Sequence, residues 1–156
     1  MFNIFKKANS NDVCSPCDGL CLDITESKDQ TFATKLMGDG FLVKPESDDV
    51  CSPVNGTLTM IFPTLHAFGI KMDNGKEVLV HIGIDTVNLK GDGFKSFANV
   101  NSKVKAGQKI ISFDREKVAS QGYDTSVMVI MVGQESVKKD NLNKEVKIKD
   151  VIIKSE

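Results

Sequence analysis

The sequence predicts an all-β fold, a sandwich or barrel of short strands, and three observations support that prediction. Short apolar runs recur along the chain, turn signals separate them, and helical patterns are brief. Asp73-Asn74-Gly75 and Gly91-Asp92-Gly93 are examples of the turn signals. No linker divides the 156 residues, so we expect a single domain, residues 13–156, after a flexible N-terminal segment, residues 1–12.

The expected elements follow from where β-favouring apolar residues concentrate between the turn signals. The segments expected to form strands are, in chain order, residues 41–44, 56–62, 67–72, 77–84, 109–113, 127–132 and 146–154. The segments expected to form helices of one or two turns are residues 31–37 and 115–121. Strands therefore outnumber helices and make up most of the expected structure.

An internal repeat indicates that the chain consists of two related halves. Residues 13–19 (VCSPCDG) are similar to residues 50–56 (VCSPVNG), and each copy runs from an apolar residue through Ser-Pro to an Asx-Gly pair. An Asx-Gly pair between short apolar runs is a strong turn signal. In this alignment Cys14 matches Cys51, while Cys17 matches Val54.

The cysteines are expected to be packing residues. They are Cys14, Cys17, Cys21 and Cys51. Cys14 and Cys17 have the first half of a zinc spacing, but Cys51 has no close Cys or His partner in the sequence. In the repeat, two of the four occupy positions where the other copy has a plain hydrophobic residue, and free cysteine packs like one. A metal site and a disulfide stay open as weaker alternatives.

Composition excludes some broad classes of function. The net charge is −1 and no extended Lys/Arg run is present, which argues against general nucleic-acid binding. No stretch approaches the ~18 apolar residues of a membrane span, and the first residues lack the apolar core of a secretory signal. We therefore expect a cytoplasmic protein. Phe2, Ile4 and Phe5 before Lys6 and Lys7 leave a weak membrane-surface anchor as the alternative to a frayed terminus.

The candidate chemical groups are the two histidines, His66 and His81. Alternation over residues 76–85 places the aliphatic residues at 78, 80, 82 and 84 on a core-facing side, and Leu79, His81 and Gly83 on the other. Because Gly83 has no side chain, one flank of His81 is expected to be open to an approaching partner.

Thr64 lies two residues before His66, so in an extended chain its hydroxyl points to the same face and can orient that imidazole. If a hairpin turning at residues 73–75 pairs the two strands, the imidazoles lie side by side. Phosphoryl transfer suits such a pair. A neutral imidazole is a nucleophile without a separate base, and a second imidazole can donate a hydrogen bond to a phosphoryl oxygen.

The residues around both histidines resemble the glucose-family enzyme IIA of the bacterial sugar phosphotransferase system. The strongest similarity covers residues 75–87 (GKEVLVHIGIDTV), and residues 62–68 (FPTLHAF) are similar to the segment with the family's second histidine. Residues 35–40, 89–94 and 104–108 also match, in order and with matching gaps. Several motifs in register are more specific than any one alone.

This resemblance implies a fold and a phosphotransferase activity. The fold would be an antiparallel β-sandwich with a duplicated hybrid motif and one or two very short helices. His81 would accept phosphate from the phosphocarrier HPr and pass it to the IIB domain of a sugar permease. His66 would hydrogen-bond the phosphoryl group, and Thr64 would orient His66. The Gly83 carbonyl would fix the tautomer of His81.

The resemblance also implies the surroundings of the pair. Asp85 and Val87 would border the site, and Phe32, Phe62 and Leu79 would form an apolar rim for docking partners. No cofactor is implied, and zinc at the histidine pair is expected only in a complex. A regulatory role, with regulated permeases or kinases as partners, is implied for a free-standing chain. The family often has an aromatic residue where this chain has Leu79, which bears on the choice of partner.

Other classes of function remain as alternatives. A biotinyl or lipoyl carrier module also has Ser-Pro and Asx-Gly repeats, and Ile70-Lys71-Met72 resembles a biotinylation tripeptide. However, Lys71 is expected to fall before the hairpin tip. A zinc peptidase needs three protein ligands, and His81-Ile82-Gly83 lacks a paired histidine. A non-catalytic regulatory binding protein is the third alternative.

Overall fold

The computed structural model describes residues 10–155, which form antiparallel sheets with a few short helical turns. The strands are β1 (Val13–Cys14), β2 (Gly19–Asp23), β3 (Gly40–Pro45), β4 (Asp49–Cys51), β5 (Gly56–Ile61), β6 (Ala67–Met72), β7 (Glu77–Ile82), β8 (Phe94–Ser96), β9 (Lys103–Val104), β10 (Lys109–Phe113), β11 (Val127–Met131), β12 (Lys144–Val146) and β13 (Val151–Ile153). The helical elements are η1 (Ile24–Glu26), α1 (Gln30–Ala33), η2 (Thr86–Leu89) and α2 (Arg115–Ser120).

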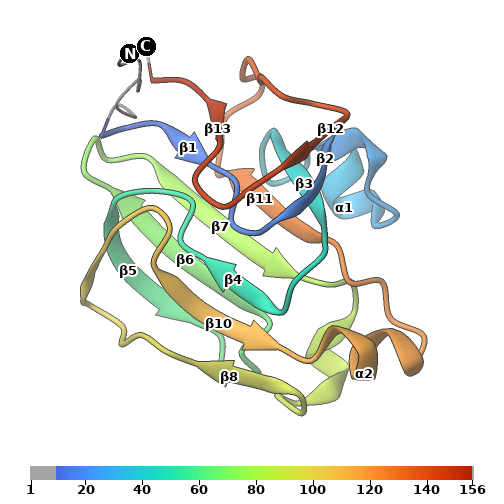
Figure 1. The fold of residues 1–156 in the computed structure, drawn as a ribbon. Helices are drawn as coiled ribbons and strands as arrows, with labels where there is room; N and C mark the ends of the chain where they lie inside the picture. The colour runs from blue at the N-terminus through green and yellow to red at the C-terminus, as the bar shows by residue number, and fades with distance from the viewer. Residues whose placement is uncertain (1–9, 156) are drawn as a thin grey trace, which may run out of the picture.

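The strands build a sandwich, which confirms the predicted fold class. An eight-stranded sheet has the order β12-β2-β3-β11-β7-β6-β5-β9 within the described residues. Two smaller sheets, β4-β10-β8 and β1-β13, lie over one face of it (Figure 1). Every strand pair in these sheets is antiparallel. The smaller sheets contain strands that the sequence analysis missed, because runs of two or three residues are too short to show a period.

The repeated segments are related by their hydrogen bonds as well as their sequence. The Cys14 amide donates to the Pro53 carbonyl at 2.7 Å, and the Cys51 amide donates to the Pro16 carbonyl at 2.7 Å. In both copies the serine hydroxyl donates to the backbone carbonyl two residues later, at 2.6 Å. Each copy therefore satisfies polar groups of the other, and the predicted duplication is present in the fold.

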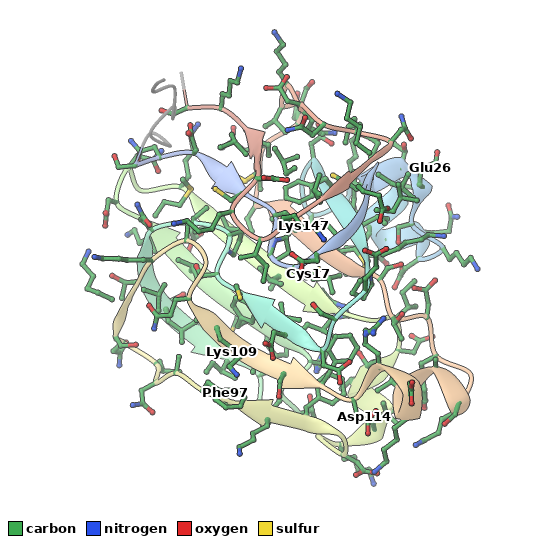
Figure 2. The ribbon with its side chains drawn as sticks, in the orientation of Figure 1. Cys17, Glu26, Phe97, Lys109, Asp114 and Lys147 are labelled. Atoms are coloured by element: carbon green, nitrogen blue, oxygen red, sulfur yellow. The ribbon has the colours of Figure 1, made fainter. Side chains whose placement is uncertain are left out.

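The cysteines are buried and free, as predicted for packing residues. Burial raises the pKa of the Cys14 and Cys51 thiols to about 11 and that of Cys21 to about 12. Cys17 lies in the interior of the sandwich (Figure 2), with no exposed surface. Thiols with such raised pKa values remain protonated and unreactive at neutral pH.

The prediction of one strand over residues 146–154 is wrong. Two short strands, β12 and β13, flank a turn in which the Asp150 amide donates to the Lys147 carbonyl at 2.9 Å. Lys149 in this turn has a φ of 77°. Lysine gives no sequence signal for a positive φ, because glycine and asparagine are the residues that usually mark one.

The predicted helix over residues 31–37 is also too long. The Asp29 side chain caps α1 by accepting from the Thr31 amide at 2.9 Å, and the helix ends at Ala33. Lys35 has a φ of 61°, which an α-helix cannot accommodate. The helix expected over residues 115–121 is present as α2.

Side chains from the two faces of the eight-stranded sheet form two separate clusters. The inner cluster fills the sandwich between this sheet and the smaller sheets, and it includes Phe41, Phe68, Val80, Ile82, Val129 and Phe113. The outer cluster lies on the opposite face and contains Ile24, Phe32, Leu42, Ala67, Leu79, Met128 and Ile130. The segment with η1 and α1 covers part of the outer cluster (Figure 1).

None of the helices in the described residues has the length and hydrophobicity to cross a bilayer. The proposed weak anchor, Phe2, Ile4 and Phe5 with Lys6 and Lys7, lies outside the described residues. The same is true of the predicted N-terminal segment apart from residues 10–12.

Candidate functional site

The β6–β7 hairpin brings the two histidines together. The strands pair so that Ala67 lies opposite His81, and the Ile82 amide donates to the His66 carbonyl at 2.7 Å. The two imidazole ring centroids are 5.0 Å apart, with an angle of 79° between the ring planes. The side-by-side arrangement expected from the sequence is therefore present.

His81 is held in one tautomer by a backbone carbonyl. Its Nδ1 lies 2.8 Å from the carbonyl oxygen of Gly83, and a carbonyl oxygen can only accept a hydrogen bond. Nδ1 therefore carries the proton, which leaves the lone pair of Nε2 available as a nucleophile. The Phe32 ring lies against this imidazole, with 4.9 Å between the centroids.

The surroundings of His81 favour its neutral form. Burial, followed by the proximity of His66, lowers its pKa from 6.5 to about 4. The carboxylates of Asp29 and Asp85 act in the opposite direction, as does the Gly83 carbonyl, but these effects are smaller. At neutral pH the imidazole is thus uncharged and keeps its nucleophilic lone pair.

His66 is more deeply enclosed, with 4% of its surface exposed. Its Nδ1 lies 2.6 Å from the Thr64 hydroxyl oxygen, and the Phe62 ring stands edge-on at a centroid distance of 5.1 Å. Burial lowers the pKa of His66. The positive φ of Leu65, 61°, turns the chain between Thr64 and His66, so the two side chains meet through a turn and not through an extended segment.

The expectation that Gly83 opens one flank of His81 is wrong. Gly83 has a φ of 75°, and a Cβ atom there would lie 2.5 Å from the Thr86 methyl carbon and 2.9 Å from the Asp124 carbonyl oxygen. Glycine is needed at this position for the chain turn and the close packing. Because β7 ends at Ile82, Ile84 leaves the alternation and packs against the outer cluster, not in the inner core as predicted.

Asp85 and Val87 lie at the start of η2, directly after the turn at Gly83. Asp85 has a φ of 62°, and its side chain makes no capping hydrogen bond. Val87 is 47% exposed. The buried Thr86 between them donates its hydroxyl to the Ile82 carbonyl at 2.5 Å, which ties η2 to the end of β7.

The residues expected to form an apolar rim are less exposed than a rim requires. Phe32 and Leu79 are only 4% and 8% exposed and belong to the outer cluster, while Phe62 is partly buried against it. Of these residues, Phe32 lies against the His81 ring and Phe62 against the His66 ring. Leu36 and Met37, which follow α1, are exposed apolar residues that the sequence analysis did not single out. The sequence analysis had placed both residues inside the expected helix over residues 31–37, which ends at Ala33 in the structure.

The described residues contain no group of three or more His, Cys, Asp or Glu side chains placed to hold a metal ion. The two imidazoles alone do not supply the three protein ligands of a catalytic zinc site. Lys71 lies within β6, paired with Glu77, so it is not at the exposed hairpin tip where a carrier lysine would be modified.

Comparisons with known proteins identify the family of this chain. Residues 11–137 match the family model for the phosphoenolpyruvate-dependent sugar phosphotransferase system, EIIA 1. A glucose-specific EIIA component from Mycoplasma capricolum is 45% identical over 109 residues, which cover 70% of this chain and 71% of that protein. A Bacillus cereus glucose-specific EIIA component is 36% identical over 136 residues, covering 87% of this chain and 82% of that protein.

Two further similarities concern a longer protein and a solved structure. A glucose-specific EIICBA component from Streptococcus pneumoniae is 42% identical over 135 residues, which cover 86% of this chain but only 19% of that protein. The solved glucose permease IIA from Mycoplasma capricolum superimposes with a TM-score of 0.83 at 37% identity, covering 98% of both chains.

Proposed function

This chain belongs to the EIIA 1 family of the phosphoenolpyruvate-dependent sugar phosphotransferase system, and we propose that it carries a phosphoryl group on His81 between two protein partners. The observation that supports His81 most directly is its hydrogen bond to the Gly83 carbonyl. That bond fixes the proton on Nδ1 and leaves Nε2 free to attack phosphorus.

Each transfer exchanges one bond at phosphorus for another. As the Nε2–phosphorus bond forms, the bond between phosphorus and the donor's nitrogen breaks. Throughout this step the proton stays on Nδ1 of His81, which donates it in a hydrogen bond to the Gly83 carbonyl. In the second transfer the Nε2–phosphorus bond breaks as the acceptor bonds to phosphorus. Because little covalent work falls to the protein, its contribution is mainly orientation and charge stabilisation.

His66 stabilises the phosphoryl group in this proposal. With the Thr64 hydroxyl donating to its Nδ1, the proton of the neutral ring lies on Nε2, where it can be donated to a phosphoryl oxygen. The lowered pKa of His66, caused by burial, keeps the ring uncharged and able to hold this arrangement. His66 therefore assists transfer and does not itself carry phosphate.

HPr is the proposed donor and the IIB domain of a sugar permease the proposed acceptor. The matched EIICBA component of Streptococcus pneumoniae combines an A part, which this chain matches, with B and C parts in one protein. That combination supports a IIB domain as the acceptor. Both steps are placed in the cytoplasm, with Asp85 and Val87 at the border of the site. Zinc binding at the histidine pair would need at least one further ligand from a partner, because this chain supplies two imidazoles.

Reconstituted phosphorylation tests the proposal. The chain is incubated with phosphoenolpyruvate, enzyme I and HPr, and its intact mass is measured before and after acid or alkali treatment. One acid-labile, alkali-stable phosphoryl group is expected in the wild type and none in His81→Ala. His66→Ala should accept phosphate but pass it poorly to a permease IIB domain. Phe97→Ala, on the far β8–β10 surface (Figure 2), is the matched control and should behave as wild type.

Three outcomes would contradict the proposal. Phosphate on a residue other than His81 would remove the assigned carrier. A biotin or lipoyl adduct on Lys71 would favour a carrier module instead. Absence of any phosphorylation by active HPr would favour a non-catalytic regulatory binding protein.

A further inference from the structure

A loop between two paired strands covers His81. Strands β2 and β3 are neighbours, with Asp23 opposite Phe41, and the chain between them leaves the sheet as residues 24–39. This loop contains η1 and α1 and lies at the edge of the molecule, where Glu26 is labelled in Figure 2. It places the Phe32 ring against His81.

The two ends of this loop meet on one ammonium group. Lys139 Nζ lies 2.5 Å from Oδ1 of Asp23, at the end of β2, and 2.6 Å from Oδ1 of Asp39, directly before β3. The Lys139 side chain is 5% exposed and that of Asp39 is 1% exposed. The lysine comes from the segment between β11 and β12, distant from the loop in sequence.

We propose that Lys139 is a positioning residue for His81: by joining Asp23 to Asp39 it closes the base of the 24–39 loop and holds Phe32 against the imidazole. The sequence gives no indication of this role, since Lys139 lies beyond the part of the chain with clear repeat or histidine motifs. No ion pair elsewhere in the described residues joins one lysine to two carboxylates.

The charges at the loop base make the two contacts interdependent. Burial by itself would raise the pKa values of Asp23 and Asp39, but the hydrogen bonds from Lys139 and from backbone amides outweigh it, and both pKa values are lowered. Both carboxylates are therefore charged at neutral pH. Without the ammonium they would repel each other across the loop base, and a buried unpaired charge is strongly unfavourable.

A second cation cannot replace Lys139 in this role. Lys35 Nζ lies 3.5 Å from Asp39 Oδ1, but Lys35 belongs to the loop itself. Its charge can offset part of the Asp39 carboxylate without connecting the loop to the rest of the molecule. The backbone amide of Val137 also donates to Asp39, at 2.9 Å, and backbone hydrogen bonds join Asp39 to Gln134 and Met131. Without Lys139 the end of the loop before β3 therefore stays attached to this segment, whereas Asp23 keeps its pairing with Phe41 but loses its ion pair.

Opening of the loop would change the environment of His81. The ionisable groups around this imidazole are His66 from the residue directly before β6, Asp29 from the loop and Asp85 from the turn after β7. Withdrawal of Phe32 admits water to the ring and lessens the burial that disfavours its charged form. The pKa of His81 should then rise toward its ordinary value, although departure of Asp29 with the loop would reduce the rise.

The test compares Lys139→Met with Lys138→Met. Lys138 is the neighbouring residue, is exposed and forms no ion pair with the described residues, so it controls for loss of one positive charge. In Lys139→Met, NMR titration should show the His81 pKa raised by roughly one unit. Amide exchange over residues 24–38 should accelerate roughly tenfold or more, while amides of β7 and β11 should not change. Lys138→Met should match the wild type in both measurements.

Asp23→Asn is the second variant, because Asp23 is the more exposed carboxylate and its loss leaves Lys139 paired with Asp39. It should open the loop less than Lys139→Met does, and it keeps the test valid if Lys139→Met fails to fold. An unchanged His81 pKa and unchanged loop exchange in a folded Lys139→Met would overturn the proposal. Uniform acceleration of exchange across the whole sheet would also overturn it, since that result indicates general stability alone.

The biological consequence rests on the proposed function, whereas the titration and exchange measurements do not. In a reconstituted system, the rate of phosphoryl transfer from HPr should fall in Lys139→Met and stay unchanged in Lys138→Met. If wild-type His81 accepts no phosphate, the proposed function fails while the effect of Lys139 on His81 can still be measured.

Discussion

The two faces of the eight-stranded sheet differ in what covers them. The inner face packs against two smaller sheets, and its side chains form a cluster with almost no exposed surface. The outer face has the smaller cluster, covered in part by short helical turns, and it bears both histidines. One sheet thus provides both a closely packed core and a partly open chemical surface.

Neighbouring residues in β7 illustrate this contrast. Val80 points into the inner cluster and is fully buried, whereas His81 points to the outer face and is partly exposed. Successive side chains in a strand point to opposite faces, so a change of one residue exchanges the two environments. The rigid inner packing fixes the strands, and fixed strands determine the distance between the imidazoles.

The first prediction tests the difference in packing through stability. Phe41→Ala, on the inner face, should lower the free energy of unfolding by about 3–5 kcal/mol, because a fully buried aromatic leaves a cavity. Phe62→Ala, on the partly covered outer face, should cost roughly 1 kcal/mol. Urea denaturation of both variants measures the difference. Similar losses would show that the outer face is packed as closely as the core.

The second prediction concerns the turn beside His81. Gly83→Ala should lower stability by about 2–4 kcal/mol, because the new methyl group meets Thr86 and the Asp124 carbonyl at a positive φ. Gly75→Ala is the matched control: its φ is 89°, but no atom lies within 4 Å of the new Cβ. It should cost about 1 kcal/mol, from the backbone conformation alone. Equal losses in thermal denaturation would contradict the steric explanation.

The third prediction uses the pH dependence of stability. The folded chain protonates His81 near pH 4, whereas the unfolded chain does so near pH 6.5, so acid favours the unfolded state in this window. Between pH 7 and pH 5 the wild type should lose about 2 kcal/mol more stability than His81→Asn. Urea denaturation at both pH values measures this difference. Parallel losses in the two proteins would mean that the pKa of His81 is not lowered by folding.

The fourth prediction concerns the orientation of His66 and has the smallest effect on stability. Thr64→Val removes the hydroxyl beside Nδ1 and should cost about 1 kcal/mol. Nitrogen NMR should also show a mixture of His66 tautomers. Thr59→Val removes a hydroxyl that donates to the Gly69 carbonyl, so it should cost a similar amount without changing the tautomer. A single unchanged tautomer in Thr64→Val would show that another group orients His66.

Much of the fold could be predicted where local patterns were long enough. Strand β6 was expected over residues 67–72 and strand β10 over residues 109–113, and both agree with the structure. Strands of two or three residues were missed because they contain no complete period, and the five-residue strand β2 was missed as well. The turn at Lys149 was missed because a lysine at positive φ is indistinguishable in sequence from any other lysine.

The candidate site was predictable in its members but not in its enclosure. The residues of the hairpin were close enough in sequence for pairing to bring His66 beside His81. The expectation that Gly83 leaves one side of His81 open was wrong. Thr86 and the Asp124 carbonyl, from segments later in the chain, occupy the space where a side chain at this position would lie. Whether Phe32 and Leu79 would be exposed or buried also depended on how the 24–39 loop, which contains Phe32, packs against the sheet.

The sequence by itself determined the all-β class, the duplicated turns and the pairing of two histidines. These features depend on the alternation of apolar residues, on turn residues and on the short sequence separation of the two histidines, all of which can be read directly from the sequence. Only the tertiary structure decided that Phe32 and Leu79 are buried on the outer face and that Lys139 meets Asp23 and Asp39. Contacts between residues about a hundred positions apart depend on how packed strands bring their loops together, and no local pattern records that.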